Sequence, residues 1–307
     1  QAFTMAEILL SLTIIGVVAA ITLPSLTGNI NERTWNTQRK ALYARISQAI
    51  PLMGSVNGYA NAETFVTGGL AKVLKINNIC SPDNIKDCGF SSKITKLTAS
   101  NMELPTKLSE LNNALVSVDI SETGGWGNQS SFLTDSDAAA FETANGESVL
   151  IFYNPNCVSS LGEESSMHGL AQYFYVQPKF CVNLVYDLNG SKGPNTVNKD
   201  IGFITVFYPT DSIVVAPLPL THNASSSIQY NDINKYCLNQ DSESRVPNIN
   251  ELTSLFYNQD LVGIYSGDYW SSSVISATEV WSQRFYLGSR YNAPRTHSGL
   301  NLRCVKR

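Results

Sequence analysis

Charged side chains are scarce in this sequence. They make up 15% of the residues, against roughly 25% in ordinary soluble proteins. The net charge is -4, and Lys and Arg are scattered along the chain rather than gathered in a stripe. Because binding to nucleic acid relies on a concentrated basic field, we expect no nucleic-acid partner. Ser, Thr and Asn are plentiful in the second half, which is typical of an exported surface.

Signatures of catalysis are also missing. The three histidines, His168, His222 and His297, lie in unrelated contexts, and the chain has no GxSxG, HExxH, P-loop or dinucleotide-binding pattern. Those patterns supply nucleophiles, zinc ligands and phosphate cradles. We therefore expect a protein that is not an enzyme and that carries no cofactor.

The six cysteines lack the spacings that hold zinc, haem or a redox pair, since CxxC, CxxCH and Cys/His clusters are absent. An even number of cysteines without such spacings favours disulfides formed in an oxidising compartment. Sequence alone leaves many pairings open. We favour closure between neighbours, which pairs Cys80 with Cys88, Cys157 with Cys181, and Cys237 with Cys304.

One long uncharged run stands near the start of the chain. No charged residue occurs from Ile8 to Asn31, and Ile8–Leu26 has about the 20 residues that cross a bilayer as a helix. An amphipathic pattern follows at helical spacing as far as Ile50. Together they predict one helix of roughly 70 Å, whose first half must protrude because no compact domain is that long.

Two residues inside this predicted helix are poor helix formers. Gly16 and Pro24 both lie in the uncharged run. Proline lacks the amide proton and clashes with the preceding turn, so we expect a kink or local unwinding near Pro24.

A carboxylate, Glu7, heads the run. The sequence FTMAE from Phe3 to Glu7, followed by IIGVVAAITLP, resembles the class III signal and N-terminal helix of type IV pilins and related pseudopilins. The resemblance implies cleavage by a prepilin peptidase between Ala2 and Phe3, and methylation of the new amine of Phe3. Ala2 replaces the Gly that is usual before the cut, which leaves Gln1 or Phe3 as the mature N-terminus.

The resemblance also gives roles to residues of the run. It implies that Glu7 pairs with the N-terminal amine of a neighbouring subunit and sets the register of assembly, because a buried carboxylate needs an opposite charge. The alternative is a Glu favoured by its own helix dipole at the lipid interface. Gly16 and Pro24 match the positions that bracket a stretch that loses helicity in assembled pili. The alternative is that the two residues mark a static kink in a membrane helix.

We predict an α+β fold with four parts. These are an N-terminal pilin helix at 1–57 (hydrophobic 3–27, amphipathic 28–57), a globular head with an antiparallel sheet at 58–215, a Pro/Ser/Asn linker at 216–229, and a C-terminal domain at 230–307. In the head, the apolar runs after Asn145-Gly146, up to Asn189-Gly190 and from Ile201 onward read as strands.

The segment DLNG in the head contains clustered oxygen ligands. Asp187, Asn189 and Asp200 could surround a calcium ion, because hard cations favour such ligands. The simpler interpretation is a hairpin turn at Asn189-Gly190, since the spacing of an EF-hand loop is absent.

The C-terminal segment has its own resemblance. A helix-entering motif at Val246–Leu252, the sequence YWSS at Tyr269–Ser272 and RCV at Arg303–Val305 resemble C-type-lectin-like domains of the Fibrobacter major paralogous family. Such a fold implies that Cys237 and Cys304 join its first helix to its last strand. It also favours core positions for Trp270 and Trp281. The polar stretch GSRYNAPRTHSG is the candidate ligand-binding loop, with Arg290, Tyr291, Arg295 and His297; a solvated loop that binds nothing is the alternative.

These resemblances imply a structural subunit, the major pilin of a type IV pilus or pilus-like filament on the bacterial surface. Its partners would be copies of itself, the prepilin peptidase and the pilus assembly machinery, with the inner membrane holding the unassembled subunit. Two alternatives remain. One is a minor pilin or tip adhesin that binds a glycan or surface through the C-terminal domain, and the other is a type II secretion pseudopilin.

Overall fold

The structure, a computed structural model, describes residues 5–110, 137–155, 157, 175–176, 180–207, 214–215, 220–224, 228–263, 267–286 and 288–306. Within its helices and strands, the side chains of residues 6–8, 10–11, 19–31, 175–176, 214–215 and 220–224 lie outside this description. The chain divides into two units, Gln1–Leu42 and Tyr43–Arg307.

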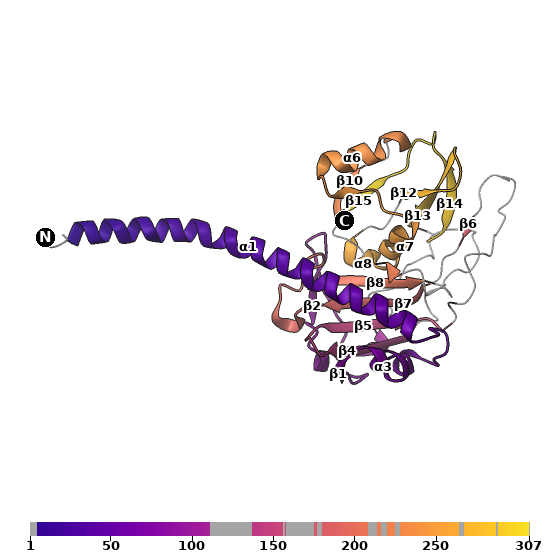
Figure 1. The fold of residues 1–307 in the computed structure, drawn as a ribbon, viewed down its shortest axis with the longest axis horizontal. Coiled ribbons are helices and arrows are strands. Elements are labelled where there is room, and N and C mark those ends of the chain that lie inside the picture. Colours follow the sequence, from indigo (N-terminus) through magenta and orange to yellow (C-terminus); the bar gives the residue numbers. More distant parts are fainter. Residues whose placement is uncertain are drawn as a thin grey trace. The chain divides into compact units, whose positions relative to one another are not determined.

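A single α-helix, α1 (Met5–Leu52), takes in both the uncharged run and the amphipathic segment (Figure 1). The helical conformation continues through Gly16 and Pro24, so the unwinding that we expected near Pro24 is not found in the single chain. A proline removes only one of the amide donors of a helix, so the neighbouring turns can continue. The helix ends before Gly54, which takes a left-handed φ of 80°.

The expected membrane-length stretch, Ile8–Leu26, lies partly outside the side-chain description, at residues 8, 10–11 and 19–26. Among the residues described with their side chains, no helix is both long and apolar enough to cross a membrane.

The centre of the second unit is a six-stranded antiparallel sheet, and mixed helix and sheet make the fold α+β. Its strand pairs run β1-β4, β4-β5, β5-β7, β7-β8 and β8-β9. The strands in spatial order are β1 (Ile76–Ile79), β4 (Asp137–Thr143), β5 (Ser148–Tyr153), β7 (Phe180–Asp187), β8 (Ile201–Phe207) and β9 (Val214–Val215). The three predicted strands, after Asn145-Gly146, up to Asn189-Gly190 and from Ile201 onward, are confirmed as β5, β7 and β8. Strand β4, which precedes Asn145, was not predicted.

Short elements lead into the sheet. Residues 62–73 form a helical stretch in three pieces, and Asn61 begins it by accepting the amide of Thr64 at 2.8 Å. The pieces are α2 (Ala62–Phe65), the π-helix η1 (Val66–Leu70) and α3 (Ala71–Val73). The 3₁₀ helix η2 (Ile85–Cys88) and the hairpin of β2 (Lys93–Thr95) and β3 (Asn101–Glu103) follow.

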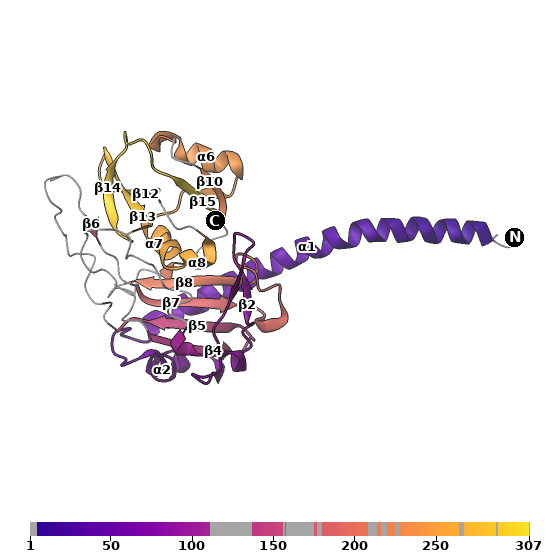
Figure 2. The same cartoon turned by 180° about the vertical axis from the view of Figure 1, so that it is seen from behind.

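The C-terminal segment forms two small sheets and short helices, seen from both sides in Figures 1 and 2. The three-stranded sheet has the order β10-β15-β11 and the four-stranded sheet β12-β13-β14-β6. The elements are β6 (Tyr175–Val176), β10 (Leu220–Ala224), α6 (Ile233–Gln240), β11 (Ser244–Arg245), α7 (Ile249–Tyr257), α8 (Gln259–Val262), β12 (Asp268–Val274), β13 (Glu279–Arg284), β14 (Arg290–Pro294) and β15 (Leu302–Lys306).

Two strands of these sheets come from outside residues 230–307. Strand β10 lies in the stretch 216–229 that we expected to be a linker, and it pairs with β15. Strand β6 comes from the expected head and pairs with β14. Backbone pairing with a strand far along the chain gives order to a segment whose composition alone favours a loop.

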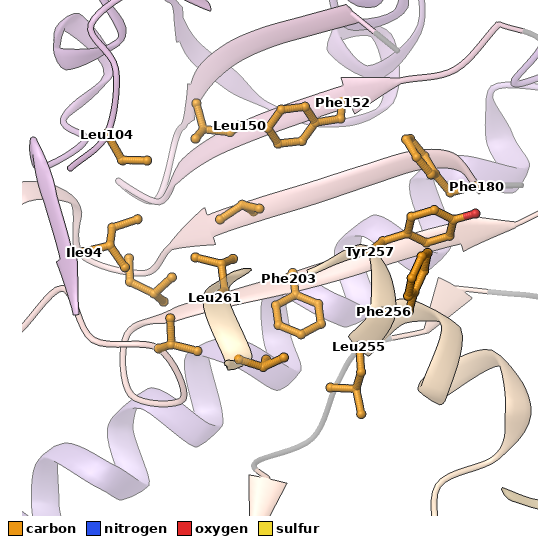
Figure 3. Packing of buried hydrophobic residues seen from close by; sticks show 14 of the residues in the cluster. Ile94, Leu104, Leu150, Phe152, Phe180, Phe203, Leu255, Phe256, Tyr257 and Leu261 are labelled. Carbon is orange, nitrogen blue, oxygen red and sulfur yellow. The ribbon is translucent and has the colours of Figure 1, made fainter. Parts of the chain in front are cut away.

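One hydrophobic core joins the large sheet to the C-terminal helices. Leu150 and Phe152 of β5 and Phe203 of β8 belong to the same buried cluster as Leu255 and Phe256 of α7 (Figure 3). Polar side chains also join these parts: Asn183 of β7 and Asn258 exchange amide hydrogen bonds of 3.0 and 3.1 Å. The expected head and the expected C-terminal domain are therefore packed as one unit.

All three expected disulfides are confirmed. Cys80 bonds to Cys88, Cys157 to Cys181, and Cys237 to Cys304. The last one lies in a second buried cluster with Trp270, which is completely buried. Trp281 is only partly buried.

Candidate functional site

The first part of α1 carries large apolar side chains that are open to solvent. We call Leu9, Leu12, Ile14, Ile15, Val17 and Val18 the apolar helix surface; their exposed fractions run from 54% to 64%. Successive helical residues are rotated by about 100°. Leu9, Ile14 and Ile15 therefore point to three sides of the helix, about 100° or more apart. The apolar surface covers the helix on more than one side.

One polar side chain within this surface is satisfied inside the helix. The Thr13 hydroxyl donates to the carbonyl of Leu9 at 2.7 Å. Such back-bonding lets a hydroxyl sit in an apolar setting without an outside partner. Thr13 therefore does not interrupt the apolar character of the surface.

The expected assembly and processing residues are described only in part. Ala2 and Phe3 lie outside the described residues. Glu7 and Pro24 lie in α1, but their side chains are outside the description. Gly16 is exposed, and a Cβ added to it would meet no atom within 4 Å.

The last turns of α1 belong to the second unit and are fixed to its sheet. Ile46 and Ile50 are 1% and 2% exposed. Arg45 Nη1 donates to Glu147 Oε2 at 3.4 Å and its Nη2 bonds to Glu147 Oε1, so the buried Glu147 carboxylate is compensated. At the other end of β5, the Tyr153 hydroxyl donates to Val56 O at 2.7 Å.

Two of the four candidate ligand residues are not on a loop. Arg290 and Tyr291 lie in β14 and are each 4% exposed. Arg290 Nε donates to Thr253 Oγ1 at 2.9 Å and its Nη2 to Asn250 Oδ1 at 2.8 Å. Burial lowers the pKa of Arg290 to about 10. Both partners are on α7, so this guanidinium ties the sheet to the helix.

Tyr291 makes different contacts. Neighbouring strand residues point to opposite faces, and the Tyr291 hydroxyl donates to Asp268 Oδ2 at 2.7 Å. Burial and the adjacent Asp268 raise the pKa of Tyr291. Arg284, which is 3.3 Å from Asp268, lies over the Tyr291 ring at 4.8 Å from its centroid.

Arg295 and His297 lie after β14 and are partly buried. The Arg295 guanidinium lies 5.1 Å from the Tyr230 ring centroid and donates to Ser276 O at 3.3 Å. The His297 ring is 6.5 Å from that of Trp270. The four candidates therefore do not form one cluster, and sequence alone could not assign Arg290 to a partner on α7.

The candidate calcium ligands do come together. Asp187 ends β7, Asp200 precedes β8, and both are completely buried. Asp187 Oδ1 accepts the amide of Asn189 at 3.1 Å. Burial raises the pKa of Asp187 to about 7, with a contribution from the charge of Asp200. No group of three His, Cys, Asp or Glu side chains that could hold a metal occurs among the described residues.

A cavity of about 320 Å³ lies beside α2 and β4. Asn61, Glu63, Cys80, Leu108 and Asp137 are among the residues that line it. Asp137 accepts the Ala62 amide at 2.7 Å, and burial raises its pKa. None of the ligand residues expected from the sequence lines this cavity.

Comparison with protein-family models gives no match, and comparison with curated proteins gives none either. The pilin and lectin-like assignments therefore rest on the sequence resemblances and on the physical features described above.

Proposed function

We propose that this chain is the structural subunit of an extracellular filament of the type IV pilus kind, built from copies of itself through the first part of α1. The observation that carries the proposal is the apolar helix surface, whose six side chains are each more than half exposed. The uncharged run continues as far as Asn31.

Other copies of the same helix are the occupant that suits this surface. A helix that is apolar on several sides needs cover on several sides. Leaving six such side chains in water would forgo on the order of 10 kcal/mol of burial free energy per copy. The membrane supplies the cover before assembly, and a bundle of identical helices supplies it afterwards.

The second unit supports the same proposal. Arg45 and Glu147 fix the end of α1 to the sheet, so each helix carries a folded unit with it. Three disulfides suit a protein exposed outside the cell. A repeated contact between unlike faces that does not close into a ring generates a helical filament.

In this proposal Glu7 sets the axial register between neighbouring α1 helices in the filament. Its carboxylate, at the head of the uncharged run, pairs with the N-terminal amine of a neighbouring copy. An unpaired carboxylate buried among apolar helices would be costly, so only one axial offset between neighbours is favourable.

The test compares two variants that each remove one carboxylate from α1. Glu7→Ala is expected to abolish or strongly reduce surface filaments, while Glu32→Ala, an exposed position on the same helix, leaves filament yield near the wild-type level. Filaments are counted by electron microscopy, and disulfide formation and thermal unfolding show that the second unit is folded in both variants. Normal filament yield from Glu7→Ala would refute the proposed pairing.

A tip adhesin is the weaker proposal. Arg290 and Tyr291 are occupied by contacts within the protein. Arg295 and His297 do not line the cavity beside α2 and β4.

A further inference from the structure

Arg290 of β14 is a buried cation that no anion meets in the described part of the chain. The residue is 4% exposed. None of the ion pairs between described residues includes it. A buried charge is costly unless an opposite charge meets it, and burial accordingly lowers the pKa of Arg290 to about 10. An anion beside this guanidinium would offset the cost.

The contacts that Arg290 makes with α7 orient its guanidinium but bring no charge. Nε donates to the Thr253 hydroxyl at 2.9 Å, and Nη2 donates to the Asn250 amide oxygen at 2.8 Å. Within the described residues, the remaining nitrogen, Nη1, has no acceptor. Asn250 is only partly buried. The end of the guanidinium that contacts Asn250 therefore lies close to the protein surface.

The one acidic residue of α7 is committed to other partners. Glu251 Oε2 accepts from Arg245 Nη1 at 2.7 Å and from the Asn248 backbone amide at 2.8 Å. Its charge therefore compensates Arg245 and the start of the helix. Asn250 lies in the first turn of α7, where the helix dipole is positive. This dipole adds to the charge of Arg290 and favours an anion at the same place.

A second buried polar side chain beside Arg290 has an unmet hydrogen-bonding group. Gln283 of β13 is 0% exposed and lies directly opposite Arg290 in the strand register. Its Oε1 is 2.8 Å from Thr253 Oγ1, and its Nε2 is a buried donor without a partner. If this amide were turned over, Nε2 would bond to Thr253 and Oε1 would be the atom without a partner. In both orientations one end of the amide is unmet, which is rare in folded proteins.

Neutral groups lie around the guanidinium. The Phe207 ring centroid is 5.8 Å from Arg290 Cζ. Burial raises the pKa of Tyr257 well above its usual 10, so this neighbour is uncharged at neutral pH. An electrostatic contact is stronger in such surroundings than in water. Because one guanidinium balances one negative charge, a dianion would leave a buried negative charge, and a monoanion fits better.

We propose that Arg290 anchors a binding site for the carboxylate of a small organic acid at the start of α7. Arg290 Nη1 donates to one carboxylate oxygen, and the amide of Gln283 donates to the other. A guanidinium suits a carboxylate because its planar N–H groups match the two oxygens. The burial of Arg290 restricts the ligand to a small acid. This inference does not depend on filament assembly.

The register between β13 and β14 offers a sharp variant. Gln283→Glu places a carboxylate of nearly the same size opposite Arg290. If the free protein holds no anion there, the new carboxylate pairs with Arg290, raises the melting temperature and blocks the site. If the chain already supplies an anion, the variant adds a second buried negative charge and lowers the melting temperature.

The experiment uses the full chain purified in detergent with its disulfides intact. Sodium chloride is replaced stepwise by sodium acetate or sodium sulfate at constant ionic strength, acetamide serves as the neutral control, and the melting temperature is measured in each. We expect acetate to raise the melting temperature of the wild type, and acetamide and sulfate to have no such effect. Gln283→Glu should be more stable than the wild type in chloride and should not respond to acetate.

Two further variants test the role of the guanidinium. Arg290→Lys keeps the charge but lacks the paired donors, so its response should need at least tenfold more acetate. Arg33→Lys, an exposed position on α1, should respond like the wild type.

Three results would overturn the proposal. One is a wild type whose melting temperature is the same in acetate and chloride. Another is Gln283→Glu that is less stable than the wild type in chloride, because that result shows that the chain itself compensates Arg290. The third is a response to sulfate as large as that to acetate, which would exclude a site built for a single carboxylate.

Discussion

Phe256→Ala should destabilise the expected head and the C-terminal segment together. Phe256 is 1% exposed, and its ring centroid lies 5.4 Å from that of Tyr257 and 6.0 Å from that of Phe285. A Cβ at Gly288 would lie 2.5 Å from this ring, so the backbone on that side is already close. Truncating a buried Phe removes apolar burial and leaves a cavity, at a cost of about 3–5 kcal/mol.

That cost is a large part of the roughly 5–15 kcal/mol that holds a domain folded. The assay is urea unfolding of the full chain in detergent, followed by far-ultraviolet circular dichroism and by tryptophan fluorescence. Because Phe256 shares one core with Leu150, Phe152 and Phe203, we expect one transition whose midpoint falls equally by both probes.

A matched control shows the effect of truncating an apolar side chain that is not part of the core. Leu238 of α6 is 53% exposed, so Leu238→Ala should change the unfolding free energy by less than about 0.5 kcal/mol. Two separate transitions, with only one of them shifted by Phe256→Ala, would refute the single core and favour independent domains.

Two further predictions concern stability. Replacing Cys237 and Cys304 by Ala opens a cross-link over a sequence separation of 67, which the chain-entropy model values at about 4 kcal/mol. The corresponding change at Cys80 and Cys88, with a separation of 8, should cost about 2.5 kcal/mol. Denaturant unfolding of the two double variants measures the difference. Equal losses would contradict the loop-length argument. Burial raises the pKa of Tyr257 well above its usual 10, so above pH 10 the unfolded state loses this proton first and stability falls by up to about 1.4 kcal/mol per pH unit. The free energy of unfolding of Tyr257→Phe should be lower than that of the wild type at pH 8, but it should fall less steeply between pH 10 and 11. If the variant and the wild type lose stability equally fast over that range, Tyr257 ionises freely in the folded state.

Local sequence patterns were sufficient for elements with strong periodicity. The strand at 180–187 is mostly apolar, with Asn183 and Asp187 as exceptions, and all eight of its residues are buried. Its run of apolar residues therefore predicts it well. The disulfides were predictable because each joins cysteines that are neighbours in the order of the chain. The long helix follows from an uncharged run that continues into an amphipathic one.

Polar residues with distant partners could not be predicted in this way. Arg290 reads as a loop residue beside Tyr291 and Asn292, but Thr253 and Asn250, which are 37 and 40 residues away, orient its guanidinium. Strand β10 forms in a Pro- and Ser-rich stretch because β15 offers it a backbone edge. The signal in both cases is the tertiary contact itself, which overrides local propensity.

The connection between β7 and β8 illustrates the same limit. Asp187, Asn189 and Asp200 were visible as candidate ligands in the sequence, where a hairpin turn was the simpler interpretation. The contacts of Asn195 could not be predicted, because they depend on the folded path of the connection and on Asp200 accepting the Asn195 backbone amide.

The central claim is that copies of this chain polymerise through the first part of α1. The most direct measurement is electron microscopy of filaments sheared from the cell surface, with mass spectrometry of their main component. We expect this chain to be the main component, with its apolar helices packed together along the filament axis. Recovery of the chain only as a monomer in the inner membrane, with no filament that contains it, would contradict the account.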